Sequence, residues 1–159
     1  MTTPTVVPTG YAGDDTDFLK VKCDRSGAAR LSTGTVTVPN ATAVGAFIGL
    51  IPFNKGARFV VHDKSVHVTD IDAGTDSTLN LGIIYDDDTT YTNDVDAWVS
   101  ASTAGQAGGW LTIDEVEGMT LVTEANGWLA VESEANITEA EGTITWSIGV
   151  VYDGLDANN

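Results

Sequence analysis

The feature that most constrains the fold is a ten-residue alternation near the C-terminal end of the chain. From Thr143 to Tyr152, every second residue is apolar, and most of the residues between them are small or hydroxylated. The apolar set is Ile144, Trp146, Ile148, Val150 and Tyr152. Successive side chains of a β-strand point to opposite faces of its sheet. The pattern therefore predicts a strand with one face in a hydrophobic core and the other largely in water.

Further segments of strand character lie between turn residues. We expect strands over residues 35–38, 44–51, 58–61, 65–70 and 79–84. Asn126-Gly127 favours the positive φ angles of a type I′ turn, which predicts a hairpin between residues 119–124 and 128–132.

One helix is expected from residue 93 to residue 104. Thr92 or Asn93 would cap it, acidic residues follow in its first turn, and Gly105 would end it. Short strands separated by turns, with one short helix, predict a mainly β fold. We expect a β-sandwich, jelly-roll-like, or else a β-barrel.

The N-terminal part of the chain has a different character. Residues 1–34 contain two prolines, four glycines and only scattered apolar residues. Pro4 and Pro8 fix φ and donate no backbone hydrogen bond, so this part should be extended. We therefore divide the 159 residues into an extended N-terminal arm, residues 1–34, and a β-domain, residues 35–159.

The charge of the chain is strongly negative and unevenly distributed. Seven basic and 23 acidic residues give a net charge of −16, and every basic residue lies within residues 1–64. Residues 65–159 contain 18 acidic residues and no Lys or Arg. Such a surface repels phosphate backbones, so we expect no nucleic-acid partner. The longest apolar stretch, residues 41–53, is shorter than a membrane-spanning helix requires, so we expect no membrane partner.

The sequence contains no recognisable catalytic motif. The Gly-x-Ser-x-Gly elbow, the Walker loop and the dinucleotide-binding glycine pattern are all missing. His62 and His67 have no neighbouring Cys or carboxylate at a zinc-ligand spacing. Most acidic residues stand beside other acidic residues, not in the apolar surroundings that raise the pKa of a catalytic acid. We expect a protein that is not an enzyme and that uses no cofactor.

Two acidic segments offer oxygen ligands of the kind that calcium prefers, although neither has the EF-hand pattern. One contains the weak candidates Asp70, Asp72 and Asp76, and the other combines residues 86–88 with Asp94 and Asp96. Turns favour Asp and Gly even without an ion, so our main expectation is no metal site. Exposed tryptophans would permit sugar binding, but we expect Trp146 and Trp98 in the core and only Trp110 at the surface.

Four segments of the chain resemble small virion proteins of tailed bacteriophages. The first is Ile51-Pro-Phe-Asn-Lys-Gly-Ala-Arg-Phe, which leads into a strand, and the second runs from Val68 to Gly82. The others are Asp94-Val-Asp-Ala-Trp98, with the small residues that follow it, and the closing strand from Gly142 to Tyr152. Together they span most of residues 35–152. Several proteins of this kind decorate the capsid as oligomers, often trimers, with an N-terminal arm against the shell.

The resemblance implies a capsid decoration, or cement, protein on the outer surface of the virion, assembled in the host cytoplasm. It would bind the major capsid protein as a homo-oligomer, with a trimer as the expected state, and stabilise the head. The alternatives are a tail, neck or fibre component, or a calcium- or sugar-binding adhesion module. The arm supplies our candidate capsid contacts, which are apolar or basic: Val6, Val7, Tyr11, Phe18, Lys20, Lys22, Arg25 and Arg30.

Overall fold

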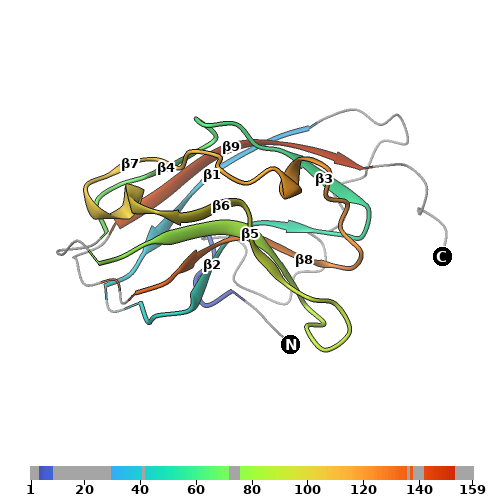
Figure 1. Cartoon of the computed structure of the whole chain (residues 1–159), viewed down its shortest axis with the longest axis horizontal. Helices are drawn as coiled ribbons and strands as arrows, with labels where there is room; N and C mark the ends of the chain where they lie inside the picture. The colour runs from blue at the N-terminus through green and yellow to red at the C-terminus, as the bar shows by residue number, and fades with distance from the viewer. Residues whose placement is uncertain are drawn as a thin grey trace.

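The computed structural model describes residues 4–8, 30–40, 42–71, 76–135, 137 and 142–152 (Figure 1). These residues form nine strands and two short 3-10 helices. The strands are β1 (Arg30–Val38), β2 (Ala46–Phe53), β3 (Ala57–Val60), β4 (Val66–Val68), β5 (Leu79–Tyr85), β6 (Asp94–Ser102), β7 (Gly109–Trp110), β8 (Gly127–Ser133) and β9 (Gly142–Tyr152). The 3-10 helices are η2 (Thr103–Gln106) and η3 (Glu117–Met119).

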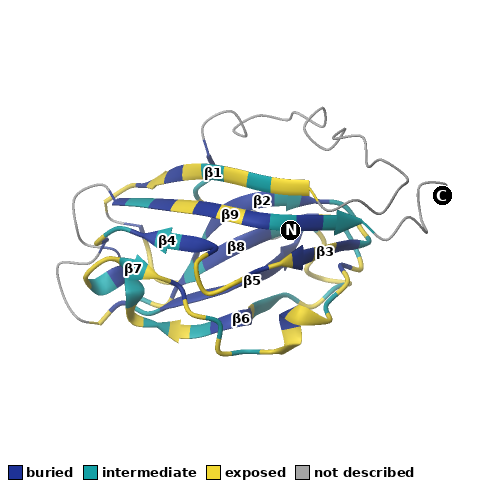
Figure 2. Cartoon of the chain, turned by 90° about the horizontal axis from the view of Figure 1, so that it is seen from above, coloured by how far each residue is buried: buried dark blue, intermediate teal, exposed yellow. Residues whose placement is uncertain are grey.

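The strands form two antiparallel sheets that pack face to face as a β-sandwich (Figures 1 and 2). The five-stranded sheet has the order β1-β9-β4-β7, with β3 also beside β9, and the four-stranded sheet has the order β2-β8-β5-β6. Four of the pairings are nested: β1 with β9, β2 with β8, β4 with β7, and β5 with β6. The sandwich predicted from the sequence is confirmed, and the alternative of a closed barrel is wrong.

Strand β9 holds the five-stranded sheet together. It pairs with β1 over nine residues on one side and with β3 and β4 on the other. Ile144, Trp146, Ile148 and Val150 are buried, whereas Thr145 and Ser147 are exposed. The two faces predicted for this strand are therefore confirmed. The other segments expected to be strands are found as β1 to β5, with bounds that differ by a few residues.

An aromatic cluster joins the two sheets through the core. Phe59 on β3 meets Phe53 on β2 and Trp98 on β6, with ring centroids 5.5 and 5.9 Å apart, and Phe53 also meets Tyr85 on β5 at 6.1 Å. All three contacts are edge-to-face. Each adds about 0.5–1.5 kcal/mol beyond the burial of the rings. The cluster fixes the position of one sheet on the other.

The helix expected over residues 93–104 is wrong, because most of this segment is strand β6. Asn93, the expected cap, instead accepts a hydrogen bond from the Tyr85 backbone N–H at 2.8 Å. Pairing with β5 determines the strand, and two register shifts within the pair interrupt the alternation that would have revealed it. In this part of the chain, helix formation is limited to η2, one turn that includes Gly105. Tertiary pairing has overridden the local preference.

The hairpin expected around Asn126-Gly127 is also wrong. Gly127 begins β8, but residues 120–124 form no strand, and β8 pairs with β2 and β5 instead. Neither Asn126 nor Gly127 has a positive φ angle. Asn126 is used differently, since its side-chain oxygen accepts from the Lys55 backbone N–H and its carbonyl accepts from Asp86.

The described part of the N-terminal arm lies against the sandwich. Val6 forms an isolated parallel bridge with Ile48 of β2 and packs against the core. Strand β1 begins at Arg30, five residues before the expected boundary between arm and domain. No helix among the described residues is long and apolar enough to cross a membrane.

Candidate functional site

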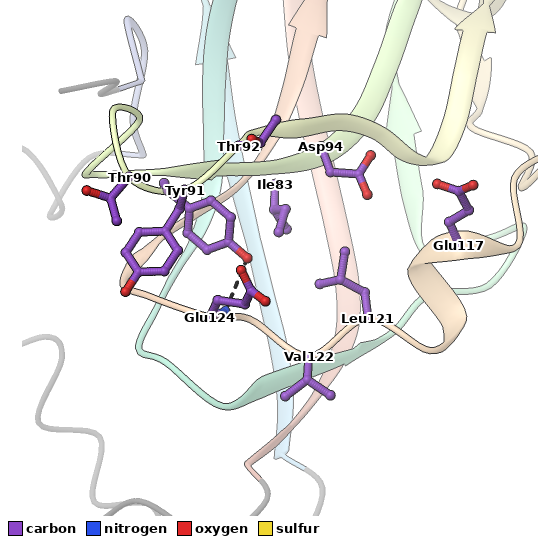
Figure 3. A pocket seen from close by; sticks show the side chains of 10 residues that line it. Ile83, Thr90, Tyr91, Thr92, Asp94, Glu117, Leu121, Val122 and Glu124 are labelled. Carbon is purple, nitrogen blue, oxygen red and sulfur yellow. Dashed lines mark hydrogen bonds between the residues drawn. The ribbon is translucent and has the colours of Figure 1, made fainter. Parts of the chain in front are cut away.

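An open pocket of 430 Å³ lies between the β5–β6 loop and the segment that joins η3 to β8 (Figure 3). Apolar side chains form part of its wall: Ile83, Leu121 and Val122. The rings of Tyr85 and Tyr91 lie 5.5 Å apart at an angle of 46°. The carboxyl groups come from Asp94, Glu117 and Glu124.

The pocket is electrostatically negative. Burial raises the pKa of the Asp94 carboxyl group, and the nearby charges of Asp96 and Glu117 raise it further. Burial also raises the pKa of Tyr85, whose hydroxyl accepts a hydrogen bond from the Glu124 backbone N–H at 3.1 Å. None of the described lining residues is a Lys, Arg, His or Cys. The pocket suits a cationic or hydroxyl-bearing group and disfavours anions.

The acidic β5–β6 loop is ordered by its own hydrogen bonds. The Asp87 carboxylate accepts from the side-chain hydroxyl of Thr89 at 2.6 Å and from the backbone N–H groups of Thr89 and Thr90. Hydrogen bonds from Thr89, and next from Thr90, lower the pKa of Asp87, whereas burial raises that of Asp86. The loop is thus a turn closed by an aspartate.

The calcium candidates of the other segment are only partly within the described residues. Asp70 and Asp76 are exposed, and Asp72 lies outside the described residues. Within the described ranges, no group of three or more His, Cys, Asp and Glu side chains could hold a metal ion. His62 lies in the β3–β4 turn, where its backbone N–H donates to the Ser65 hydroxyl, and His67 lies on β4.

A row of side chains crosses the outer face of the five-stranded sheet. Thr35 on β1 lies opposite Thr145 on β9, Thr145 lies opposite His67 on β4, and His67 lies opposite Trp110 on β7. The two threonine hydroxyls are 3.0 Å apart, and the His67 and Trp110 rings meet edge to face at 4.9 Å. Trp110 is 47% exposed, which confirms its expected surface position, and Trp98 and Trp146 are buried as expected.

We call this outer surface the acid-free face. The strand register places on it the side chains, or glycine Cα atoms, of Leu31, Thr33, Thr35, Thr37, Arg58, Val60, His67, Trp110, Thr143, Thr145, Ser147, Gly149 and Val151. None is acidic, although the described part of the chain contains 14 Asp and Glu residues. Three of them are exposed large apolar residues, Leu31, Val60 and Trp110. Depletion of charge together with exposed aromatic and aliphatic groups is typical of protein interfaces.

The residues predicted to contact a capsid are only partly visible. Val6 and Val7 are half-buried beside β2, and Arg30 is the exposed first residue of β1. The remaining candidates lie outside the described residues: Tyr11, Phe18, Lys20, Lys22 and Arg25. Neither the acid-free face nor the pocket beside Tyr85 and Tyr91 was predicted from the sequence. The alternating threonines of β1 and β9 were the available signal for the face.

No protein-family model matches the sequence, and no curated protein is significantly similar to it. Two solved structures, however, contain chains of similar fold. One is the capsid of Ralstonia phage GP4, in which a chain is 26% identical with a TM-score of 0.58, and the alignment covers 79% of this chain and 84% of that one. The other is the capsid asymmetric unit of cyanophage Pam1, with 20% identity, a TM-score of 0.52, and coverage of 79% and 85%. The second likeness is one of fold alone.

Proposed function

We propose that this chain is a structural protein of a tailed-bacteriophage virion that decorates the outer surface of the capsid. The observation that carries the proposal is the similarity to a chain in the capsid of Ralstonia phage GP4, which extends over 79% of the chain at 26% identity. A chain in the cyanophage Pam1 capsid shares the fold. The resemblance of residues 35–152 to small phage virion proteins was found independently, from the sequence.

The charge of the molecule favours the outside of the capsid over its interior. A net charge of −16 would be repelled by packaged DNA but would keep the outer surface of a particle soluble. The acid-free face gives such a molecule one side that can approach another protein without bringing carboxylates into the contact. In this proposal the partner is the major capsid protein, and the acidic remainder points to solvent.

The finer features of the proposal follow from the fold. The nested pairs place four strands in the order β1-β9-β4-β7 in one sheet and four in the order β2-β8-β5-β6 in the other. This arrangement supports a jelly roll, which is built from two packed sheets. We propose a homo-oligomer, with a trimer as the first state to test, and a structural role without catalysis. A tail, neck or fibre component is the second candidate, because the similarity to capsid chains does not by itself fix the position in the virion.

The proposal is tested by adding purified protein to heads that lack it. We expect saturable co-sedimentation with the heads, no binding to free double-stranded DNA, and a higher temperature for heat-induced release of DNA from the decorated heads. Failure to bind heads, together with binding to isolated tails or necks, would replace decoration by the second candidate. Failure to bind any virion part would overturn both.

A further inference from the structure

The two sheets have five edge strands, and the chain protects them unequally. The backbone N–H and C=O groups on the outer side of an edge strand are free to pair with another chain, and proteins usually block them. The edges of the five-stranded sheet are β1, β7 and β3, which pairs only with β9, and those of the four-stranded sheet are β2 and β6. Strand β3 has only four residues, and its outer side is partly occupied, because the Thr123 backbone N–H donates to the Ala57 carbonyl at 2.9 Å. Comparing them identifies the edge at which a foreign strand can add.

Strand β2 is covered by the N-terminal segment. The backbone N–H of Thr5 donates to the Phe47 carbonyl at 2.7 Å, and that of Gly49 donates to the Val6 carbonyl at 2.8 Å. Pro4 packs where a side chain at residue 49 would stand, since a Cβ built on Gly49 would lie 2.8 Å from Pro4 Cγ. This edge is already occupied by the chain itself.

Strands β6 and β7 are poor templates for another strand. The β5–β6 pair contains two register shifts, and Ala101 of β6 has a φ angle of +52°. Strand β6 also carries Asp94 and Asp96. Strand β7 is only two residues long. Irregularity, charge and shortness are the usual protections of an edge.

Strand β1 has none of these protections. It is nine residues long, pairs with β9 without a register shift, and has the sequence Arg-Leu-Ser-Thr-Gly-Thr-Val-Thr-Val. It contains no acidic residue, no lysine and no proline, and its only charge is at its first residue. Leu31 is 70% exposed, and Thr33, Thr35 and Thr37 are exposed on the same face. Among the described residues, no strand pairs with its outer side.

We propose that the outer edge of β1 is a strand-docking site, and that its occupant is an extended, uncharged or weakly acidic segment of the capsid shell protein. The inference rests on the proposed function. Backbone pairing along β1 would supply the affinity, and the acid-free face beside it would admit the side chains of the added strand. The shell is the better occupant than a second copy, because pairing of β1 with the β1 strand of another copy is a twofold contact that the proposed trimer does not contain.

The test uses two matched double variants in the full-length protein. L31K/T33K places two lysines beside the β1 edge, where natural proteins use lysine to block pairing. V116K/T120K places two lysines at exposed positions between β7 and β8, so both variants have the same net charge. We expect both to melt close to the wild type. Binding of L31K/T33K to undecorated heads should be at least tenfold weaker, and V116K/T120K should bind like the wild type.

Hydrogen exchange on the head-bound wild type provides the second readout. Strand addition should slow the exchange of β1 amides that exchange rapidly in the free protein. Equal binding by the two variants, or unchanged β1 exchange on heads, would overturn the docking site while leaving the decoration proposal intact. A wild type that self-associates through β1 in the absence of heads, and that L31K/T33K renders monomeric, would show that the occupant is a second copy. Wild-type protein that does not bind heads would overturn the proposed function itself.

Discussion

Gly34 on β1 lies directly opposite Trp146 on β9, and the missing side chain of the glycine makes room for the indole ring. A Cβ built on Gly34 would stand 2.3 Å from Trp146 Cζ2 and 2.7 Å from Cη2. The indole N–H donates to the hydroxyl of Ser32, also on β1, at 3.4 Å. The glycine and the tryptophan therefore form one packing unit, which joins the edge strand to the centre of its sheet.

We predict that Gly34→Ala destabilises the domain, because neither the backbone nor the buried ring can move away easily. Overpacking of this kind costs about 1–3 kcal/mol in the free energy of unfolding. Urea denaturation measures the loss. Thr37→Ala on the exposed face of the same strand is the control and should change the stability by no more than about 0.5 kcal/mol. A Gly34→Ala protein as stable as this control would contradict the packing described.

The two tryptophans at opposite sides of the five-stranded sheet should respond very differently to truncation. Trp146 is 2% exposed, so Trp146→Ala should cost about 3–5 kcal/mol. Trp110 is 47% exposed and should tolerate the same change far better. Thermal or chemical unfolding of both variants checks the difference. Similar losses would mean that the two faces of the sheet have been assigned wrongly.

These packing relations explain why some elements could be predicted and others could not. Strand β9 was evident because its alternation runs without interruption along the whole strand. Strand β6 was mistaken for a helix because its two register shifts break the alternation, while Asn93 and Gly105 stand where helix signals are expected. A strand with uninterrupted alternation can be recognised from its own sequence. An irregular strand can be recognised only together with the strand with which it pairs.

The candidate surfaces show the same limit. The threonine alternation of β1 and β9 is visible in the sequence, yet only the pairing of Thr35 with Thr145 places both on one face. The pocket combines Tyr85 of β5 with Glu117 and Leu121. The last two residues lie in the connection between β7 and β8, part of which was predicted to be a strand of a hairpin. The expected arm included Val6, but nothing in its sequence specified Ile48 as its neighbour.

The first residues of the arm should contribute measurably to stability. Residues 4–8 cover the β2 edge, and Val6 packs against the core. Deleting residues 1–8 would remove the backbone hydrogen bonds to β2 and the apolar contact of Val6 with the core, and should cost about 1–3 kcal/mol. From its composition, an arm with so few core-forming side chains would contribute little to folding, and removing about its first 20 residues would leave the melting temperature nearly unchanged. Thermal unfolding of the deletion protein, with Val6→Ala as a milder companion, decides between the two expectations.

Protonation of Asp94 should stabilise the domain as the pH falls through the folded pKa of its carboxyl group, which lies above 3.8. Folding raises the pKa of Asp94, so the folded chain binds this proton more tightly than the unfolded chain does. Its contribution is favourable at low pH and is lost as the pH rises through the folded pKa. Asp94→Asn should therefore melt at a higher temperature than the wild type at pH 7, and the difference should vanish well below the ordinary pKa of 3.8.

Asp87 supplies the opposite control for this pH experiment. Its pKa is lowered by hydrogen bonds from Thr89 and Thr90, so its contribution is present at neutral pH and is lost as the pH falls through the folded pKa, below 3.8. Asp87→Asn should thus melt below the wild type at pH 7. Parallel pH profiles for the two variants would show that the two carboxyl groups do not have the different environments described.

The most direct test of decoration is to locate and count the protein in native particles. Purified virions should be imaged by electron microscopy, and the ratio of this chain to the major capsid protein should be measured by quantitative mass spectrometry. We predict density for the sandwich at symmetry-related positions over the outer surface of the head, in a fixed stoichiometric ratio to the shell subunits. Density confined to the tail or neck, or a few copies per particle, would contradict the account.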